Sequence, residues 1–375
     1  MNRNYLRYII SDLLSKGLPV ITLLLLGATL ASVEVKKVET IYQIQGLLIN
    51  VLTFGQVYIY SRSLSFQNTQ SNGYILYVGC LLFLIYGLVV SSPILILASI
   101  ASIFQINYNL LQIKNNLIGE LRIQQINDSL NGLLFSLTLI LLVLFSGLNY
   151  YTKVLTQILA IFFILLYFRK SIYFLNKELF QNPIRFDKNI LTFIILSIIQ
   201  WGILYFDKYS SREYLNSDQA DSYFLFTLIT SSGIVLNLSV LKAIRYRIHT
   251  NRKLKTSKIS LKELLIIISI ILIVSLGGIV FLQLIGEELL PLLFIMNIIV
   301  SVLFSVMNYL ITVILQGVKN VTLKVNQLFY IFLFTLCLVF LNLFMIKSIE
   351  VYIVICITTL ITINLLLYKN SCEKI

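Results

Sequence analysis

Residues 262–284 read KELLIIISIILIVSLGGIVFLQL, and no charged residue follows Glu263 in this run. Its length matches the roughly 20 residues that an α-helix needs to cross a hydrocarbon core about 30 Å thick. Only helices and closed barrels satisfy their backbone hydrogen bonds in lipid, and the strands of such barrels are only about 10 residues long. The stretch therefore predicts a transmembrane helix.

Similar runs recur from one end of the chain to the other. The third and fourth runs are separated only by Ser91, Ser92 and Pro93, which predicts a tight hairpin. The fourth run is unusually polar, and the tenth is long enough to be tilted or broken near Asn297. In total we predict about twelve spans, at residues 11–31, 39–60, 74–92, 94–113, 130–149, 152–168, 189–206, 221–242, 262–284, 289–316, 325–346 and 349–368.

The composition of the whole chain agrees with this map. Hydrophobic residues make up 58% of the 375 residues and charged residues only 12%, whereas soluble domains carry about 25% charged residues. These proportions exclude a soluble enzyme, a secreted globular protein, a nucleic-acid-binding protein and a fibrous chain. The fold class that we predict is an all-α polytopic membrane protein.

The net charge of +13 is explained by where the lysines and arginines lie. The termini and the connections on their side of the membrane carry 22 of the 29, and the opposite connections carry six. Because cytoplasmic connections are enriched in lysine and arginine, both termini are predicted to lie in the cytoplasm. The long basic connections 169–188 and 243–261 serve this orientation, or they attract anionic headgroups of membrane lipids as well.

The connection 169–188 also divides the spans into two sets of six. We predict an N-terminal six-helix half at residues 1–186 and a C-terminal half at residues 187–375. The second and eighth spans resemble each other weakly, since both begin with an acidic residue and a tyrosine and end with an arginine and a tyrosine. Two halves of the same orientation are typical of transporters built from a parallel repeat.

Two segments of the sequence resemble a known family. The seventh span ends in Asp207-Lys208-Tyr209, and the eighth opens with Ser-Asp-Gln-Ala-Asp-Ser-Tyr at residues 217–223. The end of the second span, Gly-Gln-Val-Tyr-Ile-Tyr-Ser-Arg at residues 55–62, adds a third similarity. Together with twelve spans in two sixes, these residues resemble the polysaccharide-biosynthesis flippases of the multidrug/oligosaccharidyl-lipid/polysaccharide exporter superfamily. The connection 31–37 lacks the Leu-Gly…Phe-Gly turn that is usual in that family, which leaves the subfamily and the substrate open.

The resemblance implies an exporter architecture like that of MATE transporters, with halves that rock to alternate access. The implied cargo is a polyprenyl-pyrophosphate-linked oligosaccharide repeat unit, moved across a bacterial cytoplasmic membrane for O-antigen or capsule synthesis. The implied partners are this lipid-linked substrate, H⁺ or Na⁺ as a coupling ion, and other polysaccharide-assembly proteins. No cofactor, catalytic residue or metal site is expected.

Charged residues inside or beside the spans are the sharpest candidates for the transport path, since charge within a membrane is costly. Lys16 lies in the first span, with Asp12 four residues earlier on the same helix face. Lys16 either contacts the cargo's pyrophosphate, or it pairs with Asp12 or snorkels to the interface. Asp207 and Lys208, at the outer end of the seventh span, either form a gate or ion-coupling site or are ordinary interfacial charges.

Amide side chains within the spans form a second group of candidates, because each one both donates and accepts hydrogen bonds and so suits sugar hydroxyls. They serve equally well in bonds between helices. The amide candidates are Gln43, Gln45, Asn50, Gln56, Gln200 and Asn237, with Asn297 and Asn308 as weaker ones.

Two other functions stay open. A multidrug or small-solute exporter of the same superfamily would be expected to carry carboxylates in its cavity, and the acids near membrane depth are expected only at span ends, at Asp12, Asp207, Glu287 and Glu288. A membrane-embedded polysaccharide polymerase or transferase would need catalytic acids, bases or metal ligands. The single histidine, His249, has none of these near it, and the four cysteines are scattered.

Overall fold

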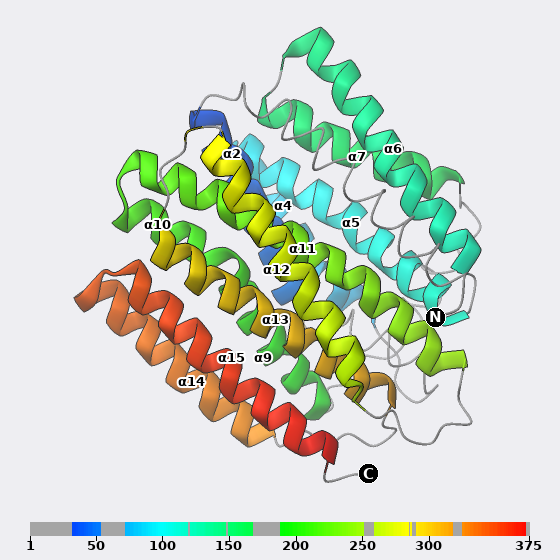
Figure 1. Ribbon diagram of the computed structural model, residues 1–375. Helices are drawn as coiled ribbons and strands as arrows, with labels where there is room; N and C mark the ends of the chain where they lie inside the picture. Colours follow the sequence, from blue (N-terminus) through cyan, green and yellow to red (C-terminus); the bar gives the residue numbers. More distant parts are fainter. Residues whose placement is uncertain are drawn as a thin grey trace. The chain divides into compact units, whose positions relative to one another are not determined.

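In the computed structural model, the structure describes residues 32–53, 72–118, 121–147, 149–167, 188–250, 259–284, 286, 290–317 and 325–372. These residues are almost all helical, and Figure 1 shows the helices. Within these described ranges, seven helices are long and apolar enough to cross a membrane. The chain divides into two compact units, Met1–Ile198 and Ile199–Ile375. The first predicted span, 11–31, lies outside the described residues.

The first unit contains α2 (Ser32–Gly46) and its π-helical continuation η1 (Leu47–Val51), followed by α4 (Gly73–Val89), α5 (Pro93–Ile118), α6 (Leu121–Ser146) and α7 (Tyr150–Tyr167). Helix α5 packs against α2, α4, α6 and α7, so it is the central helix of this unit. Helix α9 (Lys188–Trp201) crosses the boundary between the units.

The second unit continues with η2 (Gly202–Phe206), α10 (Asp207–Tyr214), α11 (Ser217–Thr250), α12 (Leu261–Leu284) and α13 (Pro291–Gly317). It ends with α14 (Val325–Leu341), its π-helical end η3 (Asn342–Ile346) and α15 (Ile349–Cys372). Helix α13 packs against α11, α12 and α15. It runs unbroken through Asn297, so the break considered there is not found.

The predicted hairpin at Ser91-Ser92-Pro93 is confirmed. Ser91 adopts φ +50°, which turns the chain, and Pro93 is the first residue of α5. Proline suits that position because the first turn of a helix needs no partner for its N–H. At Gly87 an added Cβ would lie 2.9 Å from Leu95 Cβ, so the two helices meet where this glycine has no side chain.

Several helices extend beyond the apolar runs that predicted them. Helix α6 begins at Leu121 rather than near residue 130, and α11 covers Ser217–Thr250 rather than 221–242. Hydropathy marks only the part of a helix that suits lipid, and the backbone hydrogen bonds of the helix continue into polar residues on either side. This difference matters at the start of α6, where it places an acidic residue inside a span.

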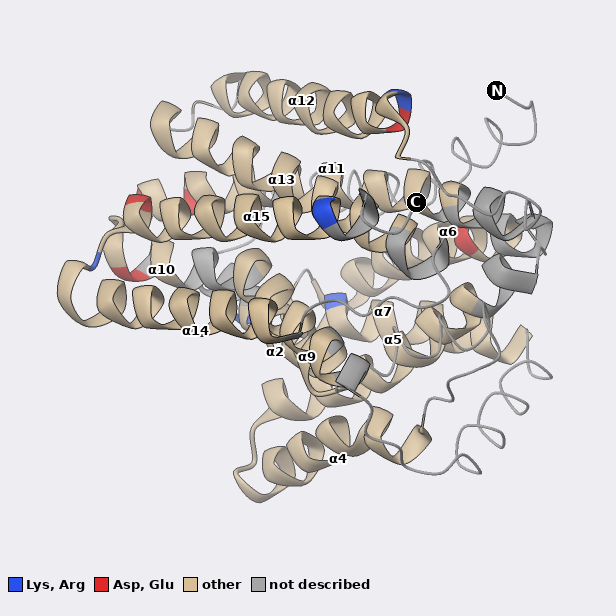
Figure 2. Cartoon of the chain, turned by 90° about the horizontal axis from the view of Figure 1, so that it is seen from below, with Lys and Arg blue, Asp and Glu red and all other residues tan. Residues whose placement is uncertain are grey.

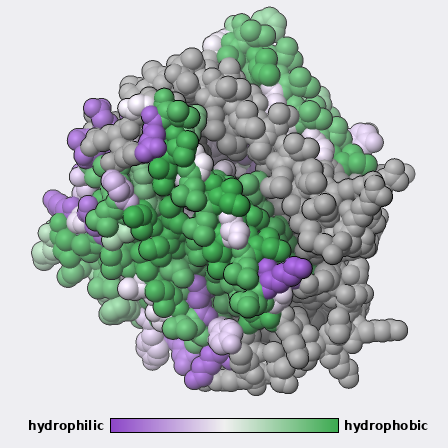
Figure 3. Space-filling view, viewed as in Figure 1, coloured by the Kyte–Doolittle hydropathy of each residue, from purple (hydrophilic) through white to green (hydrophobic). Residues whose placement is uncertain are grey.

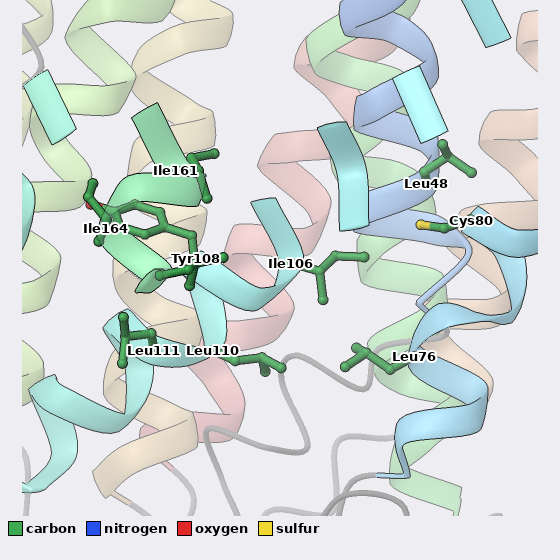
Figure 4. Close-up of a cluster of buried hydrophobic side chains, with 10 residues drawn as sticks. Leu48, Leu76, Cys80, Ile106, Tyr108, Leu110, Leu111, Ile161 and Ile164 are labelled. Atoms are coloured by element: carbon green, nitrogen blue, oxygen red, sulfur yellow. The ribbon is translucent and has the colours of Figure 1, made fainter. Parts of the chain in front are cut away.

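Each unit has an apolar core of its own. In the first unit, Ile106 and Leu110 of α5 pack with Leu48, Leu76 and Cys80 (Figure 4). In the second unit, Phe226 of α11 and Phe294 of α13 stack with ring centroids 4.0 Å apart.

The outward faces of the helices are apolar as well. Large side chains such as Leu284, Phe344 and Met345 are mostly exposed. Hydrophobic residues cover most of the described surface in Figure 3, and charged residues are sparse along the described helices in Figure 2. Lipid tails are as apolar as leucine, so such a surface is stable in a bilayer and not in water.

Candidate transport path

A lysine lies buried inside the first unit. Lys153 is the fourth residue of α7 and is only 4% exposed. Its Nζ lies 2.9 Å from the centroid of the Tyr42 ring of α2, a cation–π contact. In the predicted map Lys153 is the second residue of the sixth span, 152–168, and it is one of the six basic residues assigned to the opposite connections. The structure corrects this by burying it between packed helices.

The start of α7 is held by a reciprocal cap. The Asn149 side chain accepts from the Thr152 N–H at 2.9 Å, and the Thr152 hydroxyl accepts from the Asn149 N–H at 3.0 Å. This arrangement satisfies N–H groups that a helix start leaves open. Lys153 directly follows Thr152, so this cap fixes the stretch of backbone that carries the Lys153 side chain.

A second cation–π contact joins the same two helices. Lys37 of α2 lies over the ring of Tyr150 of α7, with Nζ 5.0 Å from the ring centroid. Each helix therefore contributes one lysine and one tyrosine. Unlike Lys153, Lys37 is only half-buried.

Amides continue from Lys153 along the interior of the unit. Gln157, one turn after Lys153 on the same face of α7, donates from Nε2 to Gln105 Oε1 at 3.3 Å. Gln105 donates in turn to Asn109 Oδ1 at 3.0 Å. Gln105 and Asn109 are among the residues that make the fourth span polar, and Gln105 has a polar partner on α7.

A buried carboxylate closes the polar face of α5. Asp128 of α6 is 3% exposed and lies within the candidate span Ile126–Ser146. Its Oδ1 accepts from the Tyr108 hydroxyl at 3.0 Å and from Gln112 Nε2 at 2.7 Å. The expectation that acids near membrane depth lie only at Asp12, Asp207, Glu287 and Glu288 was therefore wrong. The start of α6 was placed too late in the chain, which left Asp128 in a loop.

The second unit has polar contacts between helices of its own. Gln200 donates from Nε2 to Asn308 Oδ1 at 3.0 Å, and Asn237 donates from Nδ2 to the Ile267 carbonyl at 3.0 Å. The Oδ1 atom of Asn237 is buried and lacks a hydrogen-bond partner within the described part of the chain. These contacts hold helices together, which is the structural role considered for both amides.

Asn297 links two helices of the second unit. Its Oδ1 accepts from the Thr230 hydroxyl at 2.8 Å, and its Nδ2 donates to the Tyr223 hydroxyl at 3.3 Å. All three side chains are buried. Asn297 therefore joins α13 to α11.

The other candidates lie at less informative places. Lys16, Asp12 and Gln56 fall outside the described residues. Asp207 and Lys208 are the first two residues of α10, and only their backbone is described. Gln43 in α2 and Asn50 in η1 are half-buried.

Lys153 and Asp128 are the residues that the sequence interpretation missed. A sequence signal existed for each. Lys153 and Gln157 are spaced by four in a run that is otherwise mostly apolar. Asp128 lies two residues before the start of the predicted fifth span, 130–149. Among the residues described, no group of three or more His, Cys, Asp or Glu side chains lies together as a metal site would require.

Solved structures resemble the whole chain. A mutant of the Vibrio cholerae MATE transporter VcmN matches with a TM-score of 0.58 and 12% identity, over 98% of this chain and 95% of that one. An outward-facing multidrug resistance MATE family transporter of the MOP superfamily matches with a TM-score of 0.57 and 12% identity, over 99% and 94%. The MATE transporter ClbM in complex with Rb⁺ matches with a TM-score of 0.55 and 11% identity, over 97% and 93%.

Neither a protein-family model nor a curated protein sequence matches the chain. The structural likeness shows the fold: the chain has the architecture of MATE transporters and is a multi-pass membrane protein. The predicted fold class is confirmed. The similar structures are transporters rather than enzymes.

Proposed function

We propose that the protein is a flippase that moves a polyprenyl-pyrophosphate-linked oligosaccharide across the cytoplasmic membrane for surface polysaccharide synthesis. The observation that carries the proposal is the buried Lys153 with the amides of Gln157, Gln105 and Asn109 beside it. An interior with a cation and several amides suits a cargo that combines phosphate with sugar hydroxyls. A transporter fold supplies the means of moving it.

The physical task of such a protein is limited to the headgroup. The polyprenyl tail stays in the bilayer, while the charged and hydrated headgroup must avoid hydrocarbon, where each unsatisfied polar group costs several kcal/mol, roughly. Alternating access gives the headgroup a polar route that opens first to one side and then to the other. In this proposal Lys16 with Asp12 and the amides Gln43, Asn50, Gln56, Gln200 and Asn237 contribute to that route, and Asp207 and Lys208 act at its outer end.

A second candidate is a multidrug or small-solute exporter of the same superfamily. One observation favours it, namely that Asp128, the third residue of the candidate span Ile126–Ser146, is a buried carboxylate that could serve cation coupling. The Rb⁺ complex of ClbM makes ion coupling a reasonable property to test in this chain too. The two candidates differ in the charge of the cargo, so transport assays separate them.

The orientation belongs to the proposal as well. Both termini are placed in the cytoplasm, because the basic connections then lie on the cytoplasmic side. The lipid-linked cargo is made on that side, so transport runs outward. Other polysaccharide-assembly proteins would receive the cargo on the outer side of the membrane.

The proposal is tested with purified protein in liposomes that hold a fluorescent undecaprenyl-pyrophosphate oligosaccharide in the bilayer. An impermeant quencher added outside reads how much label has reached the outer leaflet, with and without H⁺ and Na⁺ gradients. Protein-free liposomes are the control. We expect protein-dependent movement of the label. Uptake of organic cations without movement of several glycans would favour the exporter instead.

A further inference from the structure

The contact between α2 and α7 leaves buried hydrogen-bond donors without acceptors. An ammonium has three N–H donors, and a ring face satisfies at most part of them. Within the described part of the chain, the Tyr42 ring is the one partner found for the Lys153 ammonium. A charge buried to this degree is normally paired with a carboxylate. Among the side chains that the structure describes, no carboxylate is paired with Lys153.

A second unsatisfied donor lies on the same face of α2. Gln45 follows Tyr42 by three residues, so their side chains are neighbours on the helix surface. Gln45 is 4% exposed, and its buried Nε2 has no hydrogen-bond partner among the described residues. One acceptor between α2 and α7 could receive hydrogen bonds from both donors, and the acceptor that an ammonium favours most is an anion.

We propose that Lys153 and Gln45, with the Tyr42 ring beside them, form a binding site for the phosphate group of a lipid-linked substrate. This inference rests on the proposed function and adds the residues that hold the charged group. In the absence of the anion, the Tyr42 ring occupies one side of the ammonium and lowers the cost of its burial. The anion then replaces the weaker ring contact with a charge-assisted hydrogen bond.

The amides of Gln157, Gln105 and Asn109 lie next to this site along α7 and α5. They are hydrogen-bonded to one another in a chain, so a hydroxyl can insert by taking over one bond at a time. The site therefore has a part for the charged group at Lys153 and a part for hydroxyls one turn further along. This order matches a phosphate attached to a sugar.

The site is closed in this structure, and α2 has a place where it can open. Lys153 is buried between α2 and α7, so the substrate enters only when these two helices separate. Immediately after Gln45, Gly46 is followed by the π-helical residues Leu47–Val51. Glycines and π-helical turns are where helices bend, so the segment that carries Tyr42 and Gln45 can swing about this point.

The site is tested by measuring the binding of radiolabelled farnesyl pyrophosphate to the full-length protein in detergent. We expect Lys153→Gln to weaken binding at least about tenfold, since a bond to a charged group is lost, and Lys153→Arg to retain most of it. Gln45→Leu should weaken binding less. The matched control is Lys37→Gln, which removes the other lysine between α2 and α7 and should bind within about twofold of the parent.

A stability measurement separates binding from a structural role. If Lys153 serves only to hold α2 to α7, Lys153→Gln lowers the thermal unfolding temperature. If it is kept unpaired for the ligand, the unfolding temperature without ligand stays the same or rises, because a buried charge has been removed. The proposal is overturned if Lys153→Gln binds farnesyl pyrophosphate as the parent does, or if only the unfolding temperature falls.

Competition identifies the source of the phosphate. Inorganic pyrophosphate should displace the probe, and short-chain phosphatidylglycerol should displace it at least about tenfold less well. Equal displacement by phosphatidylglycerol would assign the site to ordinary lipid headgroups and overturn its link to the cargo. If the liposome assay shows no flipping while Lys153→Gln still loses the probe, the anion site stands and the flippase function falls. If flipping occurs but Lys153→Gln binds the probe as the parent does, the flippase function stands and the anion site falls.

Discussion

At the scale of single residues, the two buried charges of the first unit have different surroundings. Asp128 receives hydrogen bonds from Tyr108 and Gln112, whereas Lys153 has an aromatic ring. A carboxylate that accepts two hydrogen bonds is better satisfied than an ammonium whose partner is a ring face. The lysine is the less satisfied of the two, which is why the cargo is assigned to it and not to Asp128.

Asp128→Asn distinguishes the two candidate functions. Asparagine keeps an oxygen that accepts from Tyr108 and Gln112 and loses only the charge, so folding should be little affected. We expect translocation of the lipid-linked oligosaccharide to stay within about twofold of the parent, measured in liposomes. Loss of ion-driven transport with normal expression would show that Asp128 couples ions, and would favour the exporter. Asp128→Leu, which removes the acceptor as well, is the control for structural damage.

At the scale of elements, two helices can pack closely where one of them has a glycine, because glycine has no side chain. At Gly278 in α12, an added Cβ would lie 2.7 Å from Ile229 Cγ2 of α11. That methyl group is attached to a β-branched carbon and has little freedom to move. At the adjacent Gly277, an added Cβ would meet no described atom of another helix within 4 Å. The pair is a matched test of packing in this helix.

Gly278→Ala should therefore destabilise the protein by about 1–3 kcal/mol, as overpacking does. Gly277→Ala should be neutral or slightly stabilising, because alanine favours the helix over glycine. Thermal unfolding of both variants in detergent checks the difference. Equal unfolding temperatures would show that α11 and α12 can shift apart at no cost.

The turn between α14 and α15 depends on one amide. Asn342 is buried, donates from Nδ2 to the Ser348 carbonyl at 2.9 Å, and accepts from the Ser348 N–H at 3.2 Å. Asn342→Ala leaves both groups of Ser348 without this partner, and we expect a loss of about 1–3 kcal/mol. Asn326→Ala, at an exposed position of α14, is the control. A similar unfolding temperature for the two variants would contradict the role of Asn342.

At the scale of the whole molecule, the distribution of basic residues predicts how the chain crosses the membrane. Fusions of alkaline phosphatase and of green fluorescent protein test it, since the first is active only outside the cytoplasm and the second fluoresces only within it. After residue 375 we expect fluorescence and no phosphatase activity. After Asn149, between the fifth and sixth predicted spans, we expect the opposite. The reverse pattern would place the basic connections outside.

The sequence alone determined that this is a helical membrane protein, where most of its spans lie, and the hairpin before α5. These features follow from local properties, since every backbone hydrogen bond of a transmembrane helix is made within its own segment. One stretch of sequence is therefore enough to predict such a helix.

Only the tertiary structure decided which polar residues meet. Tyr42 and Lys153 lie more than a hundred residues apart in the sequence, and Asp128 meets Tyr108 and Gln112 across two helices. Hydropathy locates a helix in the membrane but does not say which neighbour each of its faces contacts. Lys153 was therefore assigned to a connection and Asp128 to a loop, because the energy that buries them comes from partners on other helices.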